Sequence, residues 1–357
     1  MGSRAEKGVD DTRIVCTGIS GSGASEYLRN LSKVREIKVF DIGETMFEIA
    51  EKQSTPIKRT KILDKPDTEL APLRAAAFEK VLGEASNFED FIVRTHACFR
   101  WKKHLRKAFD FHYLKELNPD KFVTIVDSVA AIKSRLESNP QWKGRLSIEE
   151  ILIWQNEEIF LTELMADYQE KKFYIVPNRE PINSFLKLLF DEEALKIYIS
   201  YPISNVRDRE RWIKEKDMIR DKLRRFFVVF DPLDVRDVEL FMEAKEALEA
   251  GSSTFTTNIG GAPLEIDVKE VLEARDEIFS HTVTRDFKLI DQSDMVVVLY
   301  PEPVRSQGVA NEIIYASARK DVYLVTPLSE DPFTEYNITR RFKSISELLR
   351  YLRDEGH

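Results

Sequence analysis

The chain has 357 residues, of which 43% are hydrophobic and 32% charged, and its formal net charge is -8. This length and apolar content are sufficient for two ordinary domains, each with a core of its own. The acidic balance argues against direct binding to nucleic acid or to an anionic membrane surface.

The first eleven residues, MGSRAEKGVDD, are polar and do not resemble a signal peptide, so we expect them to be disordered. No later segment approaches the length of about 18 consecutive apolar residues that a membrane helix needs. The only two cysteines, Cys16 and Cys98, form neither a disulfide framework nor a metal motif. These features predict a cytoplasmic protein without a membrane partner.

A strand, turn and helix series then begins twice along the chain. The β-rich runs at 13–17 and 196–200 each lead into a polar loop and a helical pattern. Alternation of strands with helices predicts a doubly wound parallel sheet. The sequence therefore predicts two α/β domains, at residues 12–191 and 192–357, each built on a parallel sheet.

A glycine-rich loop directly follows the first strand. It reads G-x-x-x-x-G-x-S from Gly18 to Ser25 and precedes a helical pattern, which is the context of a phosphate-binding P-loop. Backbone amides of such a loop bind phosphate oxygens, and the Ser25 hydroxyl is a candidate Mg²⁺ ligand. The lysine that should precede this serine is replaced by Ala24. The predicted nucleotide-binding residues of the loop are Gly18, Ser20, Gly21, Ser22, Gly23, Ala24 and Ser25.

Further motifs make residues 13–180 resemble the adenylate-kinase-like nucleoside monophosphate kinases. Residues 38–46 resemble their second strand and the start of the monophosphate-binding region, and Arg74 resembles the arginine that grips the acceptor phosphate. Residues 91–97 resemble the strand that ends in D-T-H-A in archaeal relatives, with Arg94 in place of the Asp. The resemblance implies a P-loop NTPase-like fold, ATP and Mg²⁺ as cofactors, and nucleotide contacts from Gly43, Arg74 and Arg135.

The P-loop lysine places a positive charge beside the transferred phosphoryl group, and such charges carry most of the catalysis in phosphoryl transfer. Without the lysine, that charge is missing. Three alternatives follow for this domain. It is a working kinase in which an Arg or Lys at another position replaces the lysine, a nucleotide-binding or sensing module, or a domain kept for structure or assembly. The missing lysine favours the second.

In the second domain, an apolar β-rich run at 295–300 leads into a polar loop and a helix expected to follow Gly308. Ligands of open α/β sheets lie beyond the carboxyl ends of the strands, so this loop is the expected site. Asp286 and Asp294 precede the strand, and Glu312 is expected on the first turn of the helix. There the partial positive charge of the helix N-terminus favours an ionised, nucleophilic carboxylate.

These residues resemble the nucleoside 2-deoxyribosyltransferase superfamily, which includes the 2'-deoxynucleoside 5'-monophosphate N-hydrolases. Its pattern has two Asp residues before a strand and then G-x-x-x-E-x-G-x-A, with the Glu as nucleophile. The chain matches at Asp286, Asp294, Gly308, Glu312 and Ala316, but Ile314 replaces the second Gly. The resemblance implies a flavodoxin- or Rossmann-like domain without a cofactor. In it, Glu312 attacks C1' of the sugar, and Asp286 protonates or orients the departing base.

The resemblance also implies a set of substrate-binding residues. Ser306 stands where the monophosphate hydrolase branch has a Ser for the 5'-phosphate. Ser204 and Asn205 lie in the loop that holds sugar and phosphate in relatives, and they fit a helix N-cap equally well. Residues 251–261 are expected to form either a solvent-exposed loop or a lid. The predicted substrate-binding residues are Ser200, Tyr201, Pro202, Ser204, Asn205, Asp231, Ser306 and Gly308.

The combined prediction is an N-glycosidase that hydrolyses a (deoxy)nucleoside 5'-monophosphate to the free base and a sugar phosphate, with a nucleotide-binding domain upstream. The candidate catalytic residues are Glu312, Asp286 and Asp294. The alternatives are base exchange by a deoxyribosyltransferase, a nucleotide-sensing binding protein, and an active nucleotide kinase. Relatives of the second domain often build sites across subunit contacts, so we also expect a homo-oligomer.

Overall fold

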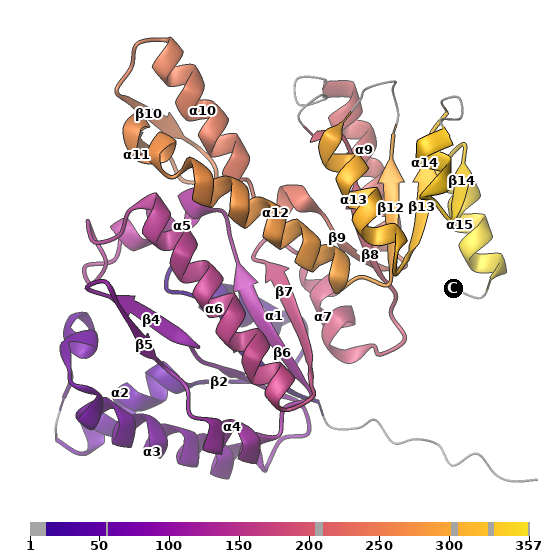
Figure 1. Cartoon of the computed structure of the whole chain (residues 1–357). Coiled ribbons are helices and arrows are strands. Elements are labelled where there is room, and N and C mark those ends of the chain that lie inside the picture. The colour runs from indigo at the N-terminus through magenta and orange to yellow at the C-terminus, as the bar shows by residue number, and fades with distance from the viewer. Residues whose placement is uncertain (1–11, 55, 204–209, 301–305, 328–331, 356–357) are drawn as a thin grey trace, which may run out of the picture. The chain divides into compact units, whose positions relative to one another are not determined.

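The computed structural model describes residues 12–54, 56–203, 210–300, 306–327 and 332–355 (Figure 1). Contacts between residues divide the chain into two compact units. The N-terminal unit comprises the residues up to Asn178 together with Arg236–Ile278, and the C-terminal unit comprises Arg179–Val235 and Phe279–His357. Each unit has a parallel sheet of its own, which confirms the prediction of parallel α/β sheets.

A five-stranded parallel sheet forms the centre of the N-terminal unit. Its order is β2-β3-β1-β6-β7, so the strand that precedes the glycine loop lies in the middle. β1 and β6 are buried along nearly their whole length, as expected for strands covered on both faces. The strands are β1 (Arg13–Thr17), β2 (Lys38–Asp41), β3 (Phe91–Arg94), β6 (Lys121–Val126) and β7 (Lys172–Pro177).

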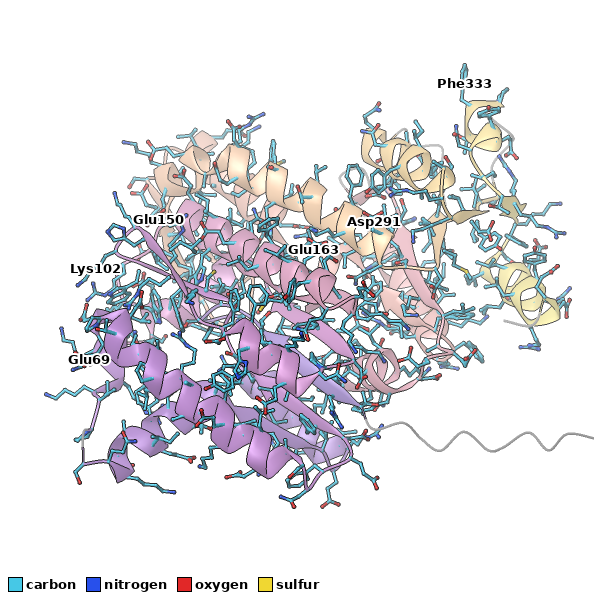
Figure 2. The ribbon with its side chains drawn as sticks, turned by 60° about the horizontal axis from the view of Figure 1, so that its bottom comes forward. Glu69, Lys102, Glu150, Glu163, Asp291 and Phe333 are labelled. Carbon is cyan, nitrogen blue, oxygen red and sulfur yellow. The ribbon has the colours of Figure 1, made fainter. Side chains whose placement is uncertain are left out.

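Helices cover this sheet, and α6 (Ile148–Tyr168) packs against β6 and β7. A capping box fixes its N-terminus: Ser147 Oγ accepts from the backbone N–H of Glu150, and the Glu150 carboxylate accepts from that of Ser147 (Glu150 is labelled in Figure 2). The remaining elements of this part of the chain are α1 (Ala24–Val34), α2 (Ile42–Lys52), the 3₁₀ helix Arg59–Asp64, α3 (Asp67–Ala85), the antiparallel pair β4 (Cys98–Trp101) and β5 (His104–Lys107), α4 (Phe111–Leu117) and α5 (Val129–Glu137).

The segment Arg236–Ile278 packs into the N-terminal unit although it lies far along the chain. Asp237 Oδ1 accepts from the backbone N–H of Val129 at 2.8 Å, and Lys133 Nζ donates to Glu270 Oε1 at 2.9 Å. The elements of the segment are α10 (Asp237–Glu249), the antiparallel pair β10 (Thr254–Thr257) and β11 (Leu264–Asp267), and α11 (Val268–Glu273).

This packing differs from two predictions. Residues 251–261 are largely exposed, as expected for a solvent-exposed loop. Their β-branched and aromatic residues nevertheless form β10. The segment belongs to the N-terminal unit and does not form a lid of the second domain. The units divide after Asn178 and not after residue 191, because α7 (Ile182–Phe190) packs against a strand of the C-terminal unit. Its buried face, which includes Phe185, is what attaches it there.

The C-terminal unit contains a second five-stranded parallel sheet, with the order β14-β13-β12-β8-β9. Numbered within the unit and read from β9, this order is 2-1-3-4-5, which is consistent with a flavodoxin-like doubly wound sheet. The strand order reverses between β8 and β12, so the ligand crevice of such a sheet lies beyond the carboxyl ends of these two strands. The strands are β8 (Lys196–Ser200), β9 (Val228–Phe230), β12 (Met295–Leu299), β13 (Asp321–Val325) and β14 (Arg340–Phe342).

The helices of the C-terminal unit surround its sheet, and α13 packs against both β12 and β13. Among the described residues, no helix is both long enough and apolar enough to cross a membrane. Besides α7, the helical elements are α9 (Glu210–Arg224), the 3₁₀ helix Pro232–Asp234, α12 (Arg275–Asp291), which begins in the N-terminal unit, α13 (Gln307–Ser317), α14 (Pro332–Tyr336) and α15 (Ile345–Asp354).

Candidate functional sites

The glycine loop between β1 and α1 has the backbone shape that its sequence predicts. Gly23 has φ of 82° and caps α1, a left-handed conformation that favours glycine. A Cβ on Gly23 would lie 2.5 Å from Asn178 Nδ2, and one on Gly18 would lie 2.7 Å from Ser22 Oγ. Close packing on both sides therefore requires glycine at these positions.

The predicted nucleotide-binding residues of the loop differ in their surroundings. Ser20 lines a cavity, whereas the side chain of Ser25, the predicted Mg²⁺ ligand, is exposed. Ser22 is buried, and its Oγ has no hydrogen-bond partner among the described residues. Ala24 is buried at the first position of α1, so this position supplies no cation where a P-loop has its lysine.

A buried glutamate holds the start of this loop. Glu158 on α6 accepts from the backbone N–H of Gly18 at 3.1 Å and from those of Ala97 and Cys98 at 2.9 Å each. Burial raises the pKa of Glu158 to about 7, while these three bonds lower it. Sequence reasoning missed Glu158, although a polar residue on the apolar face of a helix was a signal for it.

The cavity beside the loop has a volume of about 570 Å³. Its walls come from the glycine loop, from α2 and α3, from the end of β3, and from residues 138–142. Phe47, Phe99 and Trp142 contribute aromatic surface. Gly43, a predicted nucleotide-binding residue, also lines the cavity. Among the described residues, the four arginines of the lining are Arg59, Arg74, Arg94 and Arg135.

Three of these arginines have carboxylate partners. Arg94 Nη1 donates to Asp41 Oδ2 at 2.8 Å. The two terminal nitrogens of Arg59 donate to the two oxygens of Glu44 at 2.6 Å each. Arg135 donates to Asp127 Oδ2 and to the carbonyl oxygen of Gly21, both at 2.6 Å, and so ties α5 to the glycine loop.

Arg74 is the exception. It is only 8% exposed, and it makes no hydrogen bond or ion pair with the described residues of the chain. Burial lowers its pKa from the usual arginine value. The charges of Asp67 and Asp110 offset this effect only in part. A buried cation without a hydrogen-bonded partner is costly, so this position suits an anionic ligand.

The C-terminal unit places Glu312 of α13 against the carboxyl end of β8. Tyr198 Oη donates to Glu312 Oε1 at 3.0 Å, and Ser200 Oγ donates to Glu312 Oε2. This location is the point at which the strand order reverses. Burial raises the pKa of Glu312 to about 8, the nearby carboxylate of Asp286 raises it further, and the two hydroxyl bonds oppose them.

These facts correct the expectation of an ionised Glu312 on the first turn of its helix. α13 begins at Gln307, so Glu312 lies on the second turn, away from the helix N-terminus where the dipole is felt. Burial and Asp286 outweigh the remaining effect of the dipole. Asp286 lies within α12, where its Oδ1 accepts from Arg285 Nε at 3.2 Å and from Arg285 Nη2 at 3.1 Å.

The structure does not bring Asp294 to the same place. Asp294 Oδ2 accepts from the backbone N–H of Lys196 at 2.7 Å, at the first residue of β8, whereas Ser200 is the last. Asp294 therefore lies at the amino edge of the sheet, opposite Glu312. The prediction that it is catalytic is wrong on this geometry, because spacing along the chain does not reveal which edge a residue joins.

Two predicted substrate residues lie at the start of α13. Ser306 is the N-cap of α13: its Oγ accepts from the backbone N–H of Val309 at 3.4 Å, and its own N–H donates to Tyr300 Oη at 2.9 Å. Gly308 lies in the first turn of α13, and a Cβ there would meet only Ser306 Oγ at 3.9 Å. The predicted residues Ser204 and Asn205 lie outside the described residues.

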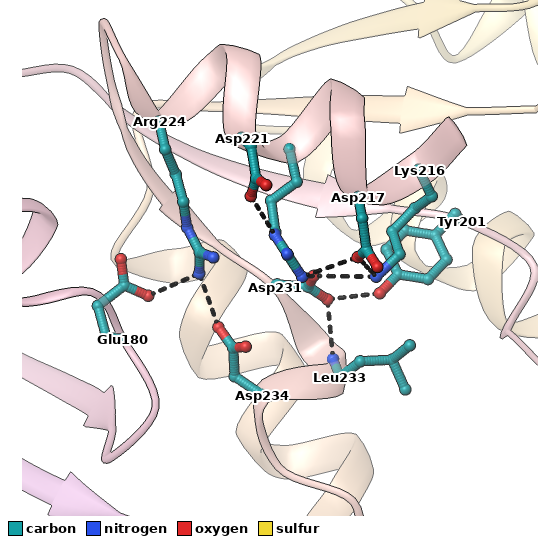
Figure 3. Close-up of polar contacts among 10 residues, drawn as sticks. Glu180, Tyr201, Lys216, Asp217, Asp221, Arg224, Asp231, Leu233 and Asp234 are labelled. Atoms are coloured by element: carbon teal, nitrogen blue, oxygen red, sulfur yellow. Dashed lines mark hydrogen bonds and ion pairs between the residues drawn. The ribbon is translucent and has the colours of Figure 1, made fainter. Parts of the chain in front are cut away.

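Asp231 is enclosed in an ion network and is only 1% exposed (Figure 3). It accepts from Tyr201 Oη, from Arg220 at 3.2 Å and from the backbone N–H of Leu233 at 2.9 Å. Lys216 Nζ lies 3.5 Å from it. Tyr201, Asp231 and the buried Pro202 are therefore parts of the core at the end of β8 and β9, and not free to contact a substrate.

Comparison with known proteins identifies similarity in the N-terminal part. A family model described as an AAA domain matches residues 17–151. An adenylate kinase of Methanocaldococcus jannaschii is 26% identical over 159 residues, which are 43% of this chain and 80% of the relative. One from Methanothermobacter thermautotrophicus is 27% identical over 143 residues, which are 40% of this chain and 77% of the relative.

Solved structures give weaker similarity. A shikimate kinase from Bacteroides thetaiotaomicron has a TM-score of 0.33 and 15% identity, covering 50% of this chain and 98% of its own. The protein TT1252 from Thermus thermophilus has a TM-score of 0.34 and 14% identity, covering 52% and 99%. The family model and the two sequence relatives support a P-loop, kinase-like domain in the N-terminal unit.

Proposed function

We propose that the N-terminal unit is a nucleotide-binding unit of the kinase type that takes a nucleoside monophosphate into its cavity. Arg74 is the observation that carries this proposal, because its buried guanidinium has no partner among the described residues and borders the cavity. A phosphate dianion would compensate that charge through charge-assisted hydrogen bonds. The relatives that match this part of the chain are adenylate kinases.

The rest of the cavity supports the same ligand class. Its volume of about 570 Å³ is within the range of roughly 300–1,000 Å³ that small-molecule sites occupy. Phe47, Phe99 and Trp142 offer flat apolar surface to a base. Because Ala24 supplies no charge to a transferred phosphoryl group, we expect binding with at most slow phosphoryl transfer.

Calorimetric titration of the full chain with AMP tests this proposal. Arg74→Gln should weaken AMP binding by about tenfold or more. Arg29→Gln, which removes an equal charge from the exposed face of α1, is the matched control and should bind as the unmodified protein does. Equal AMP affinities of the two variants would contradict the proposal. Fast formation of ADP from AMP and ATP would instead establish an active kinase.

A second candidate function, N-glycosidic cleavage of a (deoxy)nucleoside 5'-monophosphate, belongs to the C-terminal unit. It is favoured by Glu312, whose carboxylate is held by Tyr198 and Ser200 beside Asp286 at the reversal point of the sheet. In this reaction Glu312 attacks C1', the bond from C1' to the base breaks, and water then releases the sugar. The nucleophile must be ionised, so the rate should rise with pH toward about 8.

Chromatography of deoxynucleoside monophosphates incubated with the full chain tests the second function. Glu312→Gln should abolish release of free base, whereas Asp294→Asn at the opposite edge of the sheet should retain it. Addition of a second free base separates hydrolysis from transfer, because only transfer forms a new nucleoside. Absence of free base from every substrate, or equal release by Glu312→Gln, would rule this function out. A homo-oligomer stays a prediction.

A further inference from the structure

The carboxylates of the cavity are already neutralised by arginines. Of the described residues that line it, the only two carboxylates are Asp41 and Glu44. Asp41 accepts from Arg94 at 2.8 Å and also caps α2, and both oxygens of Glu44 accept from Arg59 at 2.6 Å. Neither acid is therefore free to bind a divalent cation.

The acid at the end of β6, behind the glycine loop, is engaged in the same way. Asp127 is 1% exposed; its Oδ2 accepts from Arg135 at 2.6 Å and from Asn178 at 3.2 Å, and its Oδ1 accepts from the backbone N–H of Ser128. Within the described part of the chain, no group of three His, Cys, Asp or Glu residues is arranged to hold a metal ion. The exposed hydroxyl of Ser25 is the remaining predicted ligand.

Mg²⁺ does not fit this set of side chains. In nucleotide sites it is held by one or two carboxylates together with substrate phosphates and water, in octahedral geometry with oxygen ligands. To bind one of these carboxylates, a Mg²⁺ ion would have to displace an arginine from it. The displaced guanidinium would then lie next to a divalent cation of the same sign, which is unfavourable.

Arg94 is the arginine best placed to act instead of the metal. It is the last residue of β3, which lies between β2 and β1, and it pairs in register with Cys16 near the start of the glycine loop. It lines the cavity, and its Nε is buried without a hydrogen-bond partner among the described residues. A donor and a positive charge are therefore already present where β3 and the loop meet the cavity.

We propose that this site binds nucleotide phosphates in the metal-free form, with the guanidinium of Arg94 supplying the charge that Mg²⁺ supplies in other P-loop sites. The inference rests on the proposed nucleotide-binding function of the N-terminal unit. Arg94 Nη1 holds Asp41, so the Nε that has no partner among the described residues is the group left to donate to a phosphate oxygen. Free ATP is then a better ligand than its Mg²⁺ complex, in which the phosphate charge is already partly neutralised.

Titration calorimetry of the full chain with ATP, in excess EDTA and in excess Mg²⁺, tests the proposal. Affinity should be about tenfold higher in EDTA. Tighter binding in Mg²⁺ would overturn the metal-free inference but leave the nucleotide-binding function intact. If neither ATP nor AMP binds under either condition, the proposed function itself fails, and the inference fails with it.

Substitutions at Arg94 separate its charge from its role in folding. Arg94→Gln should weaken ATP binding in EDTA by about ten- to a hundredfold, Arg94→Lys should retain most of it, and Arg94→Asp should make binding depend on Mg²⁺. Arg29→Gln is the charge-matched control. Thermal unfolding of each variant verifies that it is folded. If Arg94→Gln is not folded, the ATP affinity of Arg94→Lys in EDTA decides the test. Equal affinities of Arg94→Gln and Arg29→Gln in EDTA would overturn the proposal.

Discussion

Glu158 in the N-terminal unit and Glu312 in the C-terminal unit occupy comparable places, at the carboxyl edge of a parallel sheet, but they have different partners. Burial raises the pKa of both, to about 7 and about 8 respectively. Glu158 accepts three backbone N–H bonds and is fully buried. Glu312 accepts from two side-chain hydroxyls and keeps partial exposure.

The difference in partners determines what each glutamate is suited to do. A backbone N–H is only a donor, and its direction is fixed by the backbone. These three bonds therefore hold the Glu158 carboxylate to the glycine loop and to the loop after β3. A hydroxyl can donate or accept, so the partners of Glu312 adjust to either protonation state of the carboxyl group. Glu158 is therefore a positioning residue, whereas Glu312 is available for proton exchange and for contact with a ligand.

The largest expected effect is that of Glu158→Ala. The change leaves three buried N–H groups without an acceptor and opens a cavity, so the free energy of unfolding of the N-terminal unit should fall by about 5 kcal/mol. Urea unfolding followed by tryptophan fluorescence measures it, because three of the four tryptophans lie in this unit. Asp167→Ala, at an exposed position of the same helix, is the control. A loss equal to that of the control would remove the distinction between the two glutamates.

The second prediction concerns the pH dependence of stability. The folded-state pKa of Glu312, about 8, lies above its usual value of 4.5, so the stabilisation it provides is complete below pH 4.5 and is lost as the pH rises toward 8. The free energy of unfolding of the C-terminal unit should fall by about 4 kcal/mol over this interval.

Glu312→Gln tests this dependence, because an amide cannot ionise and the Ser200 hydroxyl can accept from it. The variant should show a correspondingly flatter profile when amide hydrogen exchange in β8 and β12 is followed across the pH range. Equal slopes for the variant and the unmodified protein would show that Glu312 titrates near its usual value.

A smaller effect is expected from Asp286→Asn. Removal of the neighbouring negative charge should lower the pKa of Glu312 by about one unit. Conversely, Tyr198→Phe should raise that pKa, because the hydroxyl bond it removes stabilises the ionised form. Carbon NMR of glutamate carboxyl groups, with the signal assigned by its absence in Glu312→Gln, gives both midpoints. Shifts of the same sign in the two variants would contradict the assigned interactions.

The smallest effect is expected from Asp294→Asn. Asp294 is 42% exposed and bonds to Lys196 at the opposite edge of the sheet, and exposed ion pairs contribute at most about 1 kcal/mol. The pKa of Glu312 and the melting temperature should stay nearly unchanged. A shift in the Glu312 midpoint as large as that caused by Asp286→Asn would place Asp294 in the same electrostatic site.

Much of the local structure was predictable from the sequence. The strands expected at 13–17 and 196–200 form at those residues, and the glycines of the loop have the conformations that their pattern requires. Glu312 was identified by its place after a buried strand and a glycine. Its partners Tyr198 and Ser200 were less accessible, because only the pairing of β8 with β12 brings them beneath α13.

Chain order and periodicity determine which segments form strands, helices and a glycine loop, because those preferences act over a few residues. Contacts between distant segments decided the rest. The segment Arg236–Ile278 packs in the N-terminal unit, and Asp294 lies at the edge opposite Glu312. The protonation of Glu158 and Glu312 depends on surroundings supplied by other elements. Burial and electrostatic fields are sums over neighbours in space, so only the tertiary structure assigns them.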